Sequence, residues 1–237
     1  NLVIYNTPDW LKAFTTGKSD RENNEERIFL CECEPGDETQ YSENNLISSP
    51  LNYTGGKFKI LNQILPLFPP SISTCVDLFC GGCNVGINVK AERTVFVDSN
   101  HQLIALFDTM KSMSADSFVD LVKRVIDKFG LSKSDVYGYD YYKCKSTTGL
   151  GSYNKSAYGR LKNYYSTLSG GEIEKSIVLY VLIVFGFNNQ IRFNAKGNFN
   201  LPVGKRDFNS KMQSKVRQFI NKLHKSDCKF VCSDFRA

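Results

Sequence analysis

The chain has 237 residues, of which 41% are hydrophobic and 23% charged, so it can bury the core of one large domain. This composition excludes a fibrous protein and a wholly disordered one. The formal net charge of +6 fits a polyanionic partner such as DNA or RNA, although many basic proteins bind no nucleic acid.

The eight cysteines do not form the pattern of a secreted disulfide framework, because such proteins are shorter and richer in cysteine. Cys80 and Cys83 have the spacing of half a zinc site, but no second pair follows at a usual distance, so we expect no metal. The longest apolar run, residues 177–187, is shorter than the about 20 residues that span a bilayer. We therefore expect a cytoplasmic protein, from a bacterial or phage-infected cell, that binds no membrane.

The first half of the chain predicts an α/β unit after an N-terminal extension. Residues 1–48 are expected to lie on the surface, with a short strand at 28–33. The elements that follow are a helix at 57–67, a strand at 74–79, a glycine turn with a helix at 85–89, a strand at 94–98 and a helix at 103–110. This alternation is typical of one half of a doubly wound sheet.

The second half predicts mainly helices. Apolar spacing indicates an amphipathic helix at 114–129 and a buried helix at 173–185. Residues 138–165 are aromatic and basic, and we expect them to be flexible. The remaining predictions are a loop with a hairpin at 187–206, a helix at 211–223 and a strand at 228–232.

The glycine turn after the first predicted strand is the strongest local indication of a ligand. Gly81 and Gly82 would let a ligand approach the backbone, and the start of the next helix would attract a carboxylate. Asp98 closes the next strand, where an acid typically accepts hydrogen bonds from ribose hydroxyls. The pattern predicts an adenosine-bearing ligand; the alternative is a packing turn with a solvated acid. The spacing is neither a dinucleotide fingerprint nor a Walker loop.

Two segments in this order resemble a known family. Tyr53-Thr-Gly-Gly-Lys57, followed by a helix and by Asp77-Leu-Phe-Cys-Gly-Gly, is similar to the opening of the Dam-type (D12 class) DNA adenine-N6 methyltransferases. The resemblance covers about residues 49–237. It implies a Rossmann-like S-adenosylmethionine-dependent methyltransferase fold with a helical DNA-recognition insert. The first segment would wrap the methionine end of the cofactor, and Asp98 falls at the family's ribose-binding acid.

Near the end of the chain, Asp234 and Phe235 stand where family members contact the cofactor's adenine. The cofactor-binding residues that the resemblance implies are Tyr53, Gly55, Gly56, Lys57, Asp77, Phe79, Gly81, Gly82, Asp98, Asp234 and Phe235.

Residues 179–204 resemble the family's DNA-recognition region. There an aromatic residue enters the duplex and an arginine reads a guanine, roles that fall on Phe187 and Arg192. Without the resemblance, the alternative is a surface hairpin rich in glycine and asparagine. Gln190 replaces the apolar residue of GATC-specific members, which argues against a GATC target. The implied partner is double-stranded DNA, bound by Phe187, Asn188, Asn189, Gln190, Arg192, Asn194 and Pro202.

The sequence departs from the family at the catalytic motif, because no Asp-Pro-Pro-Tyr occurs in it. Family order places this motif shortly after the strand at 228–232, so we expect a truncated enzyme without a catalytic residue of its own. The complete enzyme would flip an adenine out of duplex DNA and methylate N6 without a metal. One rival is a split or decayed methyltransferase that only binds DNA; a weaker one is an RNA-binding protein.

The expected organisation has four parts: an N-terminal extension at 1–48, a cofactor-binding part at 49–117, a DNA-recognition domain at 118–222 and an incomplete return to the catalytic domain at 223–237.

Overall fold

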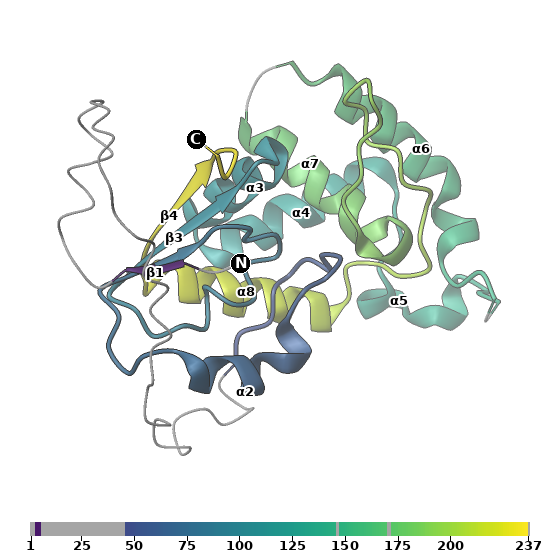
Figure 1. Ribbon diagram of the computed structural model, residues 1–237. Helices are drawn as coiled ribbons and strands as arrows, with labels where there is room; N and C mark the ends of the chain where they lie inside the picture. The colour runs from purple at the N-terminus through teal and green to yellow at the C-terminus, as the bar shows by residue number, and fades with distance from the viewer. Residues whose placement is uncertain (1–2, 6–45, 146, 170–171, 237) are drawn as a thin grey trace.

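A mixed four-stranded sheet forms one side of the molecule (Figure 1). The computed structural model describes residues 3–5, 46–145, 147–169 and 172–236. The strands lie in the order β1 (Val3–Tyr5), β2 (Thr74–Asp77), β3 (Arg93–Asp98) and β4 (Asp227–Cys232). β1 is antiparallel to β2, whereas β2, β3 and β4 run parallel. The parallel strands confirm the predicted α/β fold class, and each predicted strand from residue 74 onward is present.

The N-terminal segment contributes an edge strand that the sequence did not predict. Its residues pair with β2 from Val3↔Val76 to Tyr5↔Thr74. Residues 3–5 of the expected N-terminal extension thus form an edge strand of the sheet. The strand predicted at 28–33 lies outside the described residues.

The helix predicted at 57–67 forms as three short consecutive turns: η3 (Phe58–Ile60), α2 (Leu61–Ile64) and η4 (Leu65–Leu67). Leu61 and Leu65 are fully buried there and pack in a small core with Cys75 of β2. This core holds the segment against the outer side of the sheet.

The helix predicted at 85–89 is not formed, and this prediction is wrong. The connection from β2 to β3 consists of turns with isolated helical hydrogen bonds, such as Ile87 N–H to the Cys83 carbonyl at 3.2 Å. Cys83 has a left-handed φ of 60°, and the N–H of Gly86 donates to the Asp77 carboxylate instead of a helical carbonyl. The expected helix dipole is therefore missing from this turn.

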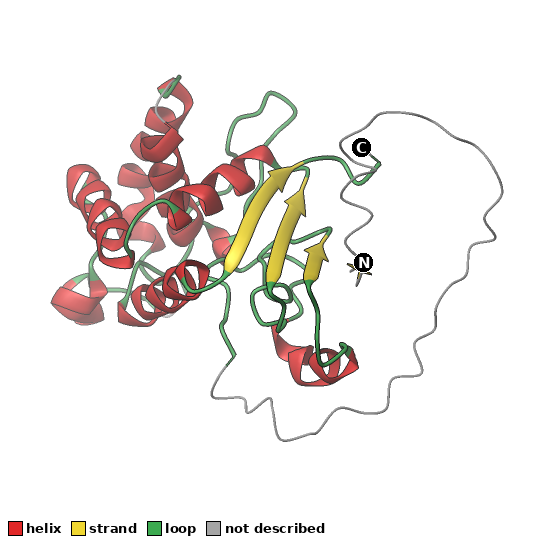
Figure 2. Ribbon diagram, turned by 90° about the vertical axis from the view of Figure 1, so that its left-hand side faces the viewer, coloured by secondary structure: helices red, strands yellow, loops and turns green. Residues whose placement is uncertain are grey.

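Among the described residues, six α-helices and the 3-10 helix η5 (Phe187–Asn189) are inserted between β3 and β4, and they lie to one side of the sheet (Figure 2). The α-helices are α3 (His101–Lys111), α4 (Ala115–Phe129), α5 (Ser134–Tyr141), α6 (Gly151–Thr167), α7 (Glu172–Phe185) and α8 (Ser210–His224). The predicted helices at 103–110, 114–129, 173–185 and 211–223 are confirmed as α3, α4, α7 and α8.

The centre of the insert is α7, whose residues 177–185 are all buried. It packs against α3, α4 and α6. The same core continues to the sheet, where Phe107 of α3 stacks on Phe230 of β4 at 5.3 Å and Phe230 on Phe96 of β3 at 5.0 Å. The sheet and the helical insert thus share one hydrophobic core.

Residues 138–165 were expected to be flexible, and this expectation is wrong. Most of them belong to α5 and α6. In α6, Asn154, Ala157, Tyr158, Leu161 and Tyr165 recur at helical spacing and are all buried. The segment is rich in tyrosine and lysine overall, so its composition does not indicate this buried stripe.

Within the described residues, no helix is long and apolar enough to cross a membrane. The same residues contain no group of three or more His, Cys, Asp or Glu side chains that could hold a metal ion.

Candidate functional site

The carboxyl ends of β2, β3 and β4, here called the carboxyl edge, bring together residues far apart in the sequence. Asp98 ends β3 opposite Cys232 of β4, and its carbonyl accepts the N–H of Ser233 at 3.1 Å. The chain then leads to Phe235, whose ring lies 5.5 Å from that of Phe79. Both rings are about half exposed, at 57% and 51%. This exposed aromatic pair at the carboxyl edge offers a surface on which a planar base can pack.

Asp98 fixes the glycine turn. Its Oδ2 accepts the N–H of Gly81 at 3.1 Å, and its Oδ1 accepts the N–H of Asn100 at 2.9 Å. A carboxylate has about four lone-pair sites, so two remain for hydroxyl groups of a ligand. The hydrogen bond from Gly81 therefore holds the Asp98 carboxylate beside the glycine turn, so that one ligand can contact both.

Asp77 acts on the site through the turn. It is 7% exposed, and its Oδ2 accepts the N–H of Gly86 at 3.0 Å. A Cβ at Gly86 would lie 2.6 Å from the Phe96 ring and 2.9 Å from Asp77, so only glycine fits. Burial raises the pKa of Asp77 above its ordinary value, while the bond from Gly86 acts in the opposite direction.

Tyr53 lies directly on the glycine turn. Gly81 has φ of +45°, and a Cβ there would be 2.8 Å and 2.9 Å from two carbons of the Tyr53 ring. A Cβ at Gly82 would also meet Tyr53, at 3.2 Å. Burial, followed by the negative charge of Asp98, raises the pKa of the Tyr53 phenol, which therefore stays neutral.

Two asparagines hold the segment before Tyr53 on the glycine turn, and the sequence did not predict them. Asn84 accepts the N–H of Ser49 at 3.0 Å. Asn88 accepts the N–H of Ile47 and donates to its carbonyl, both at 2.8 Å. Two asparagines four residues apart are a common pattern, so this spacing does not indicate that Asn84 and Asn88 bind the backbone of a distant segment.

The residues after Tyr53 form an exposed turn, which together with Asn52 and Tyr53 we call the Tyr53 loop (residues 52–57). The N–H of Gly56 donates to the Tyr53 carbonyl at 3.0 Å, and Gly55 has φ of 78°. The Lys57 ammonium donates back to the Gly55 carbonyl at 2.8 Å. Lys57 thus stabilises the loop from within.

Residues 187–206 form the predicted hairpin. Antiparallel bridges join Gly186 to Val203 and Phe193 to Phe199. At its base, the N–H of Phe187 donates to the Pro202 carbonyl at 2.9 Å, and the Phe187 side chain is 47% exposed. This anchoring holds an aromatic ring in solvent at a fixed position.

Several predicted DNA contacts serve the hairpin itself. Asn189 donates to the Val184 carbonyl at 2.5 Å, at the end of α7. Asn194 closes the hairpin tip by accepting two backbone N–H groups at 3.0 Å. One polar end of each of these two side chains is therefore used within the fold.

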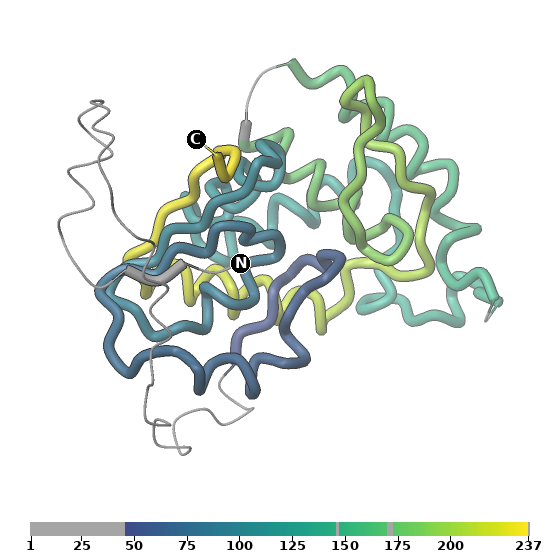
Figure 3. Tube along the Cα trace, in the orientation of Figure 1, coloured from purple at the N-terminus to yellow at the C-terminus, as the bar shows by residue number. Residues whose placement is uncertain are grey.

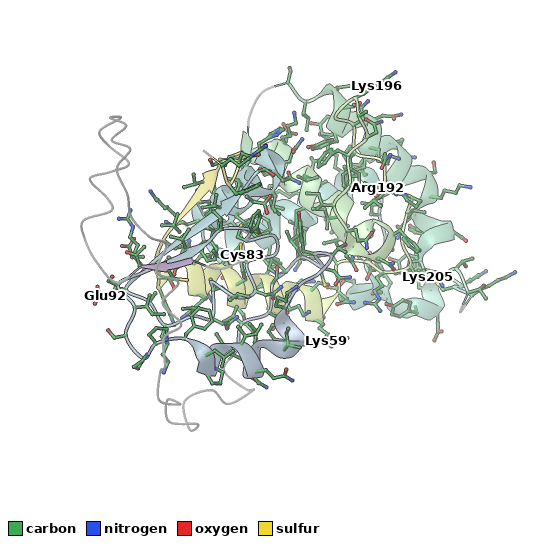
Figure 4. The ribbon with its side chains drawn as sticks, in the orientation of Figure 1. Lys59, Cys83, Glu92, Arg192, Lys196 and Lys205 are labelled. Carbon is green, nitrogen blue, oxygen red and sulfur yellow. The ribbon has the colours of Figure 1, made fainter. Side chains whose placement is uncertain are left out.

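Arg192 lies on the exposed arm of the hairpin, with Lys196 at its tip (Figure 4). Asn200 holds its guanidinium: Nε donates to Oδ1 at 2.7 Å, and Nη2 donates to the carbonyl at 3.1 Å. The Nη1 group and one hydrogen of Nη2 stay available. The guanidinium is therefore oriented before any ligand binds.

The hairpin base touches the Tyr53 loop (Figure 3). Asn52 Nδ2 donates to the Asn188 carbonyl at 2.8 Å, and Gln190 Nε2 donates to Thr54 Oγ1 at 3.4 Å. Asn188 and Asn189 both have left-handed φ, 54° and 52°, which shapes this contact. The structure thus joins the two sets of predicted site residues in one continuous surface.

Comparisons with known proteins give the family of the chain. The family model described as D12 class N6 adenine-specific DNA methyltransferase matches residues 53–237. The chain is 39% identical over 198 residues to the type II methyltransferase M.FokI of Planomicrobium okeanokoites, covering 83% of this chain and 27% of that protein. The modification methylase StsI of Streptococcus sanguinis is 37% identical over 196 residues, covering 82% of this chain and 26% of that protein.

A shorter relative is the DNA adenine methylase of Haemophilus influenzae, which is 27% identical over 186 residues. The match covers 78% of this chain and 56% of that protein. The chain therefore spans about a quarter of the length of the first two relatives and about half of the third.

Proposed function

Because the chain belongs to the D12 class N6 adenine-specific DNA methyltransferases, we propose that it forms the cofactor-binding and DNA-recognition parts of a site-specific adenine methyltransferase. The observation that carries this proposal is the contact of the Tyr53 loop with both the glycine turn and the hairpin base. One loop thereby connects a site for an adenosine-bearing ligand with a surface for DNA.

The residues of the carboxyl edge fit S-adenosylmethionine. Beside the glycine turn, Asp98 has lone pairs left for two ribose hydroxyls. The exposed rings of Phe79 and Phe235 offer an aromatic surface on which the adenine can pack, and the Tyr53 loop covers the methionine end. S-adenosylmethionine supplies the methyl group when it is bound.

The hairpin suits duplex DNA. Phe187 is an exposed ring on a rigid base, as wedging between base pairs requires. Arg192 keeps donors free on one edge of its guanidinium, which can pair with O6 and N7 of a guanine. Asn200 fixes its orientation, so little side-chain entropy is lost on binding.

We also propose the division of the chain into a cofactor-binding part at 49–117, a DNA-recognition part at 118–222 and a return to the sheet at 223–237. The passage of the chain from β3 into the helices and back into β4 supports it. The rival proposal is a module that binds DNA without catalysis.

Calorimetric titration of S-adenosylmethionine into the chain and its Asp98→Asn variant tests the cofactor site. Loss of a charged hydrogen-bond acceptor costs about 1.5–3 kcal/mol, so binding should weaken about ten- to a hundredfold. Asp227→Asn is the matched control, because Asp227 is exposed at the opposite end of β4. Equal affinity of the Asp98 variant and the wild type would exclude a ribose role for Asp98.

A further inference from the structure

A cavity of about 330 Å³ lies between the Tyr53 loop and the start of α8. It is bounded by Asn52 on one side and by Asn189 of the hairpin base on the other. Asn189 belongs to the short segment η5 (Phe187–Asn189), which also carries the exposed Phe187 ring, so the cavity borders the proposed DNA surface. A group of the DNA close to the wedged base pairs would therefore meet it.

Three cations from three separate elements line this cavity. Lys59 comes from η3, Arg206 from the end of the hairpin and Lys215 from α8. No aspartate or glutamate is among the lining residues. Figure 4 shows Lys59 below the hairpin, on the side of the molecule that also carries Lys205. The cavity is thus a concentration of positive charge in a concave, partly desolvated place.

These cations have no counter-ion in the part of the chain that the structure describes. The ion pairs found there join other residues: Lys133 with Asp127, Arg217 with Asp116 and Arg236 with Asp234. Burial, followed by the charges of Lys211 and Arg206, lowers the pKa of Lys215. Like charges held together without an acid destabilise the free protein, and an external anion relieves that cost.

A second cavity, of about 440 Å³, shows the contrast. It lies at the amino ends of the strands, beside the last turn of α8, and Lys222 and Lys225 line it. Glu92 and Asp227 line it as well, so its charges are mixed. The cavity beside the hairpin, in contrast, combines three cations with an absence of acids among its lining residues.

The cationic cavity shares Tyr53 and Gly56 with the proposed S-adenosylmethionine site, but not the residues proposed for the ribose and the adenine. Phe79, Gly81 and Asp98 do not line it. The Tyr53 ring, which lies on Gly81, stands between the two. An anion in the cavity would therefore not be the ribose or the adenine of the cofactor.

We propose that this cavity is a phosphate pocket that holds one backbone phosphate of duplex DNA beside the base pairs opened by Phe187. The proposal rests on the proposed function, because it presumes that the hairpin binds DNA. Lys59 belongs to the cofactor-binding part, whereas Arg206 and Lys215 belong to the DNA-recognition part. A single phosphate bound by all three would tie the two parts together on the DNA.

Fluorescence titrations of mixed-sequence duplex DNA at several salt concentrations test the phosphate pocket. Each of Lys59→Gln, Arg206→Gln and Lys215→Gln should lower the salt slope of the binding constant by about one unit. Binding should weaken by a similar factor, about tenfold, on every sequence, because phosphate contacts carry no base information. The control is Lys225→Gln. Lys225 caps the C-terminal end of α8, away from Lys215, so its substitution should leave the salt slope unchanged.

Two further measurements test whether Lys215 is repelled by its neighbours in the free protein and whether it contacts a phosphate in the complex. The melting temperature of the free Lys215→Gln protein should equal or exceed that of the wild type, since the substitution removes repulsion without breaking an ion pair. In a second duplex, one neutral methylphosphonate replaces the contacted phosphate. The wild type should bind this duplex with a lower salt slope than the unmodified duplex, whereas the Lys215 variant should bind both duplexes with the same salt slope. Inorganic phosphate serves as the probe for binding of a free anion.

Unchanged salt slopes in folded variants that still bind DNA would overturn the phosphate pocket and leave the proposed function intact. A loss of S-adenosylmethionine affinity with unchanged slopes would assign the cavity to the cofactor and also overturn it. Stabilisation by inorganic phosphate without any effect of the methylphosphonate would likewise refute a DNA phosphate. Absence of DNA binding by the folded wild type would instead contradict the proposed function.

Discussion

The Gly81→Ala substitution probes the contact between the Tyr53 loop and the glycine turn. The φ of +45° at Gly81 is left-handed, which costs an alanine about 1–2 kcal/mol. The new Cβ would lie 2.8 Å and 2.9 Å from ring carbons of Tyr53, a clash in a packed site that costs about 1–3 kcal/mol more. The free energy of unfolding should therefore fall by about 2–5 kcal/mol in total.

Gly130→Ala is the matched control. Gly130 also has a left-handed φ, +71°, but a Cβ there would have nothing within 4 Å. Its cost should be the backbone part alone, about 1–2 kcal/mol. The excess at Gly81 then measures the Tyr53 contact, and it should disappear when Tyr53→Ala is added, as a double-mutant cycle would show.

Urea denaturation gives the stabilities, and calorimetry gives the affinity for S-adenosylmethionine. Gly81→Ala should displace the Tyr53 ring and weaken cofactor binding at least about tenfold, whereas Gly130→Ala should not change it. If both substitutions cost the same stability and neither changes cofactor affinity, the contact has no part in the site.

Three other outcomes follow from the sequence and the structure. Arg192→Ala should lose about 1–3 kcal/mol on the cognate DNA site and relax the preference at one base pair; uniform weakening on all sequences in selection experiments would make Arg192 a phosphate contact instead. The chain by itself should transfer no tritiated methyl group to duplex DNA, because its 237 residues contain no Asp-Pro-Pro-Tyr; label at adenine N6 would contradict this. Tyr180→Phe should raise the free energy of unfolding by about 1–2 kcal/mol in urea denaturation, since the buried hydroxyl has no hydrogen-bond partner in the described part of the chain; a loss of stability would reveal a partner.

The helices with a continuous or strictly spaced apolar pattern could be predicted from the sequence. The run at 177–185 is apolar at almost every position, so only a buried element fits it, and α7 confirms this. The helix predicted at 114–129 had a clear apolar stripe, and the structure shows Ser114 as its N-cap and Gly130 as its C-cap.

Predictions failed where side chains compete with the backbone. Between β2 and β3, the Asp77 carboxylate takes the N–H of Gly86, and the expected helix gives way to turns. In α6, the polar Asn154 belongs to the core because it accepts the N–H of Ser132 at 2.8 Å and donates to its hydroxyl at 2.9 Å. Neither bond can be read from local sequence, since its partners lie 9 and 22 residues apart.

The candidate site was predictable in its residue types and not in their arrangement. The glycine turn and Asp98 carry a local pattern, so the sequence indicated them. The contact of Tyr53 with Gly81, the link from Asn52 to the Asn188 carbonyl and the orientation of Arg192 by Asn200 depend on how separate elements pack. The sequence did not predict that the three cations of the phosphate pocket lie together, because they come from three separate elements.

The order of the strands also constrains how the chain folds. β3 and β4 are neighbours, from Arg93↔Asp227 to Asp98↔Cys232, although residues 99–226 lie between them. Bringing β3 and β4 together closes a long loop, and the chain loses this entropy before the contacts between the strands form. Such non-local pairing slows folding. Helices α3 to α8 rest mainly on contacts within the insert and should collapse first, with β4 joining the sheet last. The carboxyl edge would then be completed only in the final step, so a chain halted before it would expose the edge of β3 that β4 covers and be prone to aggregate.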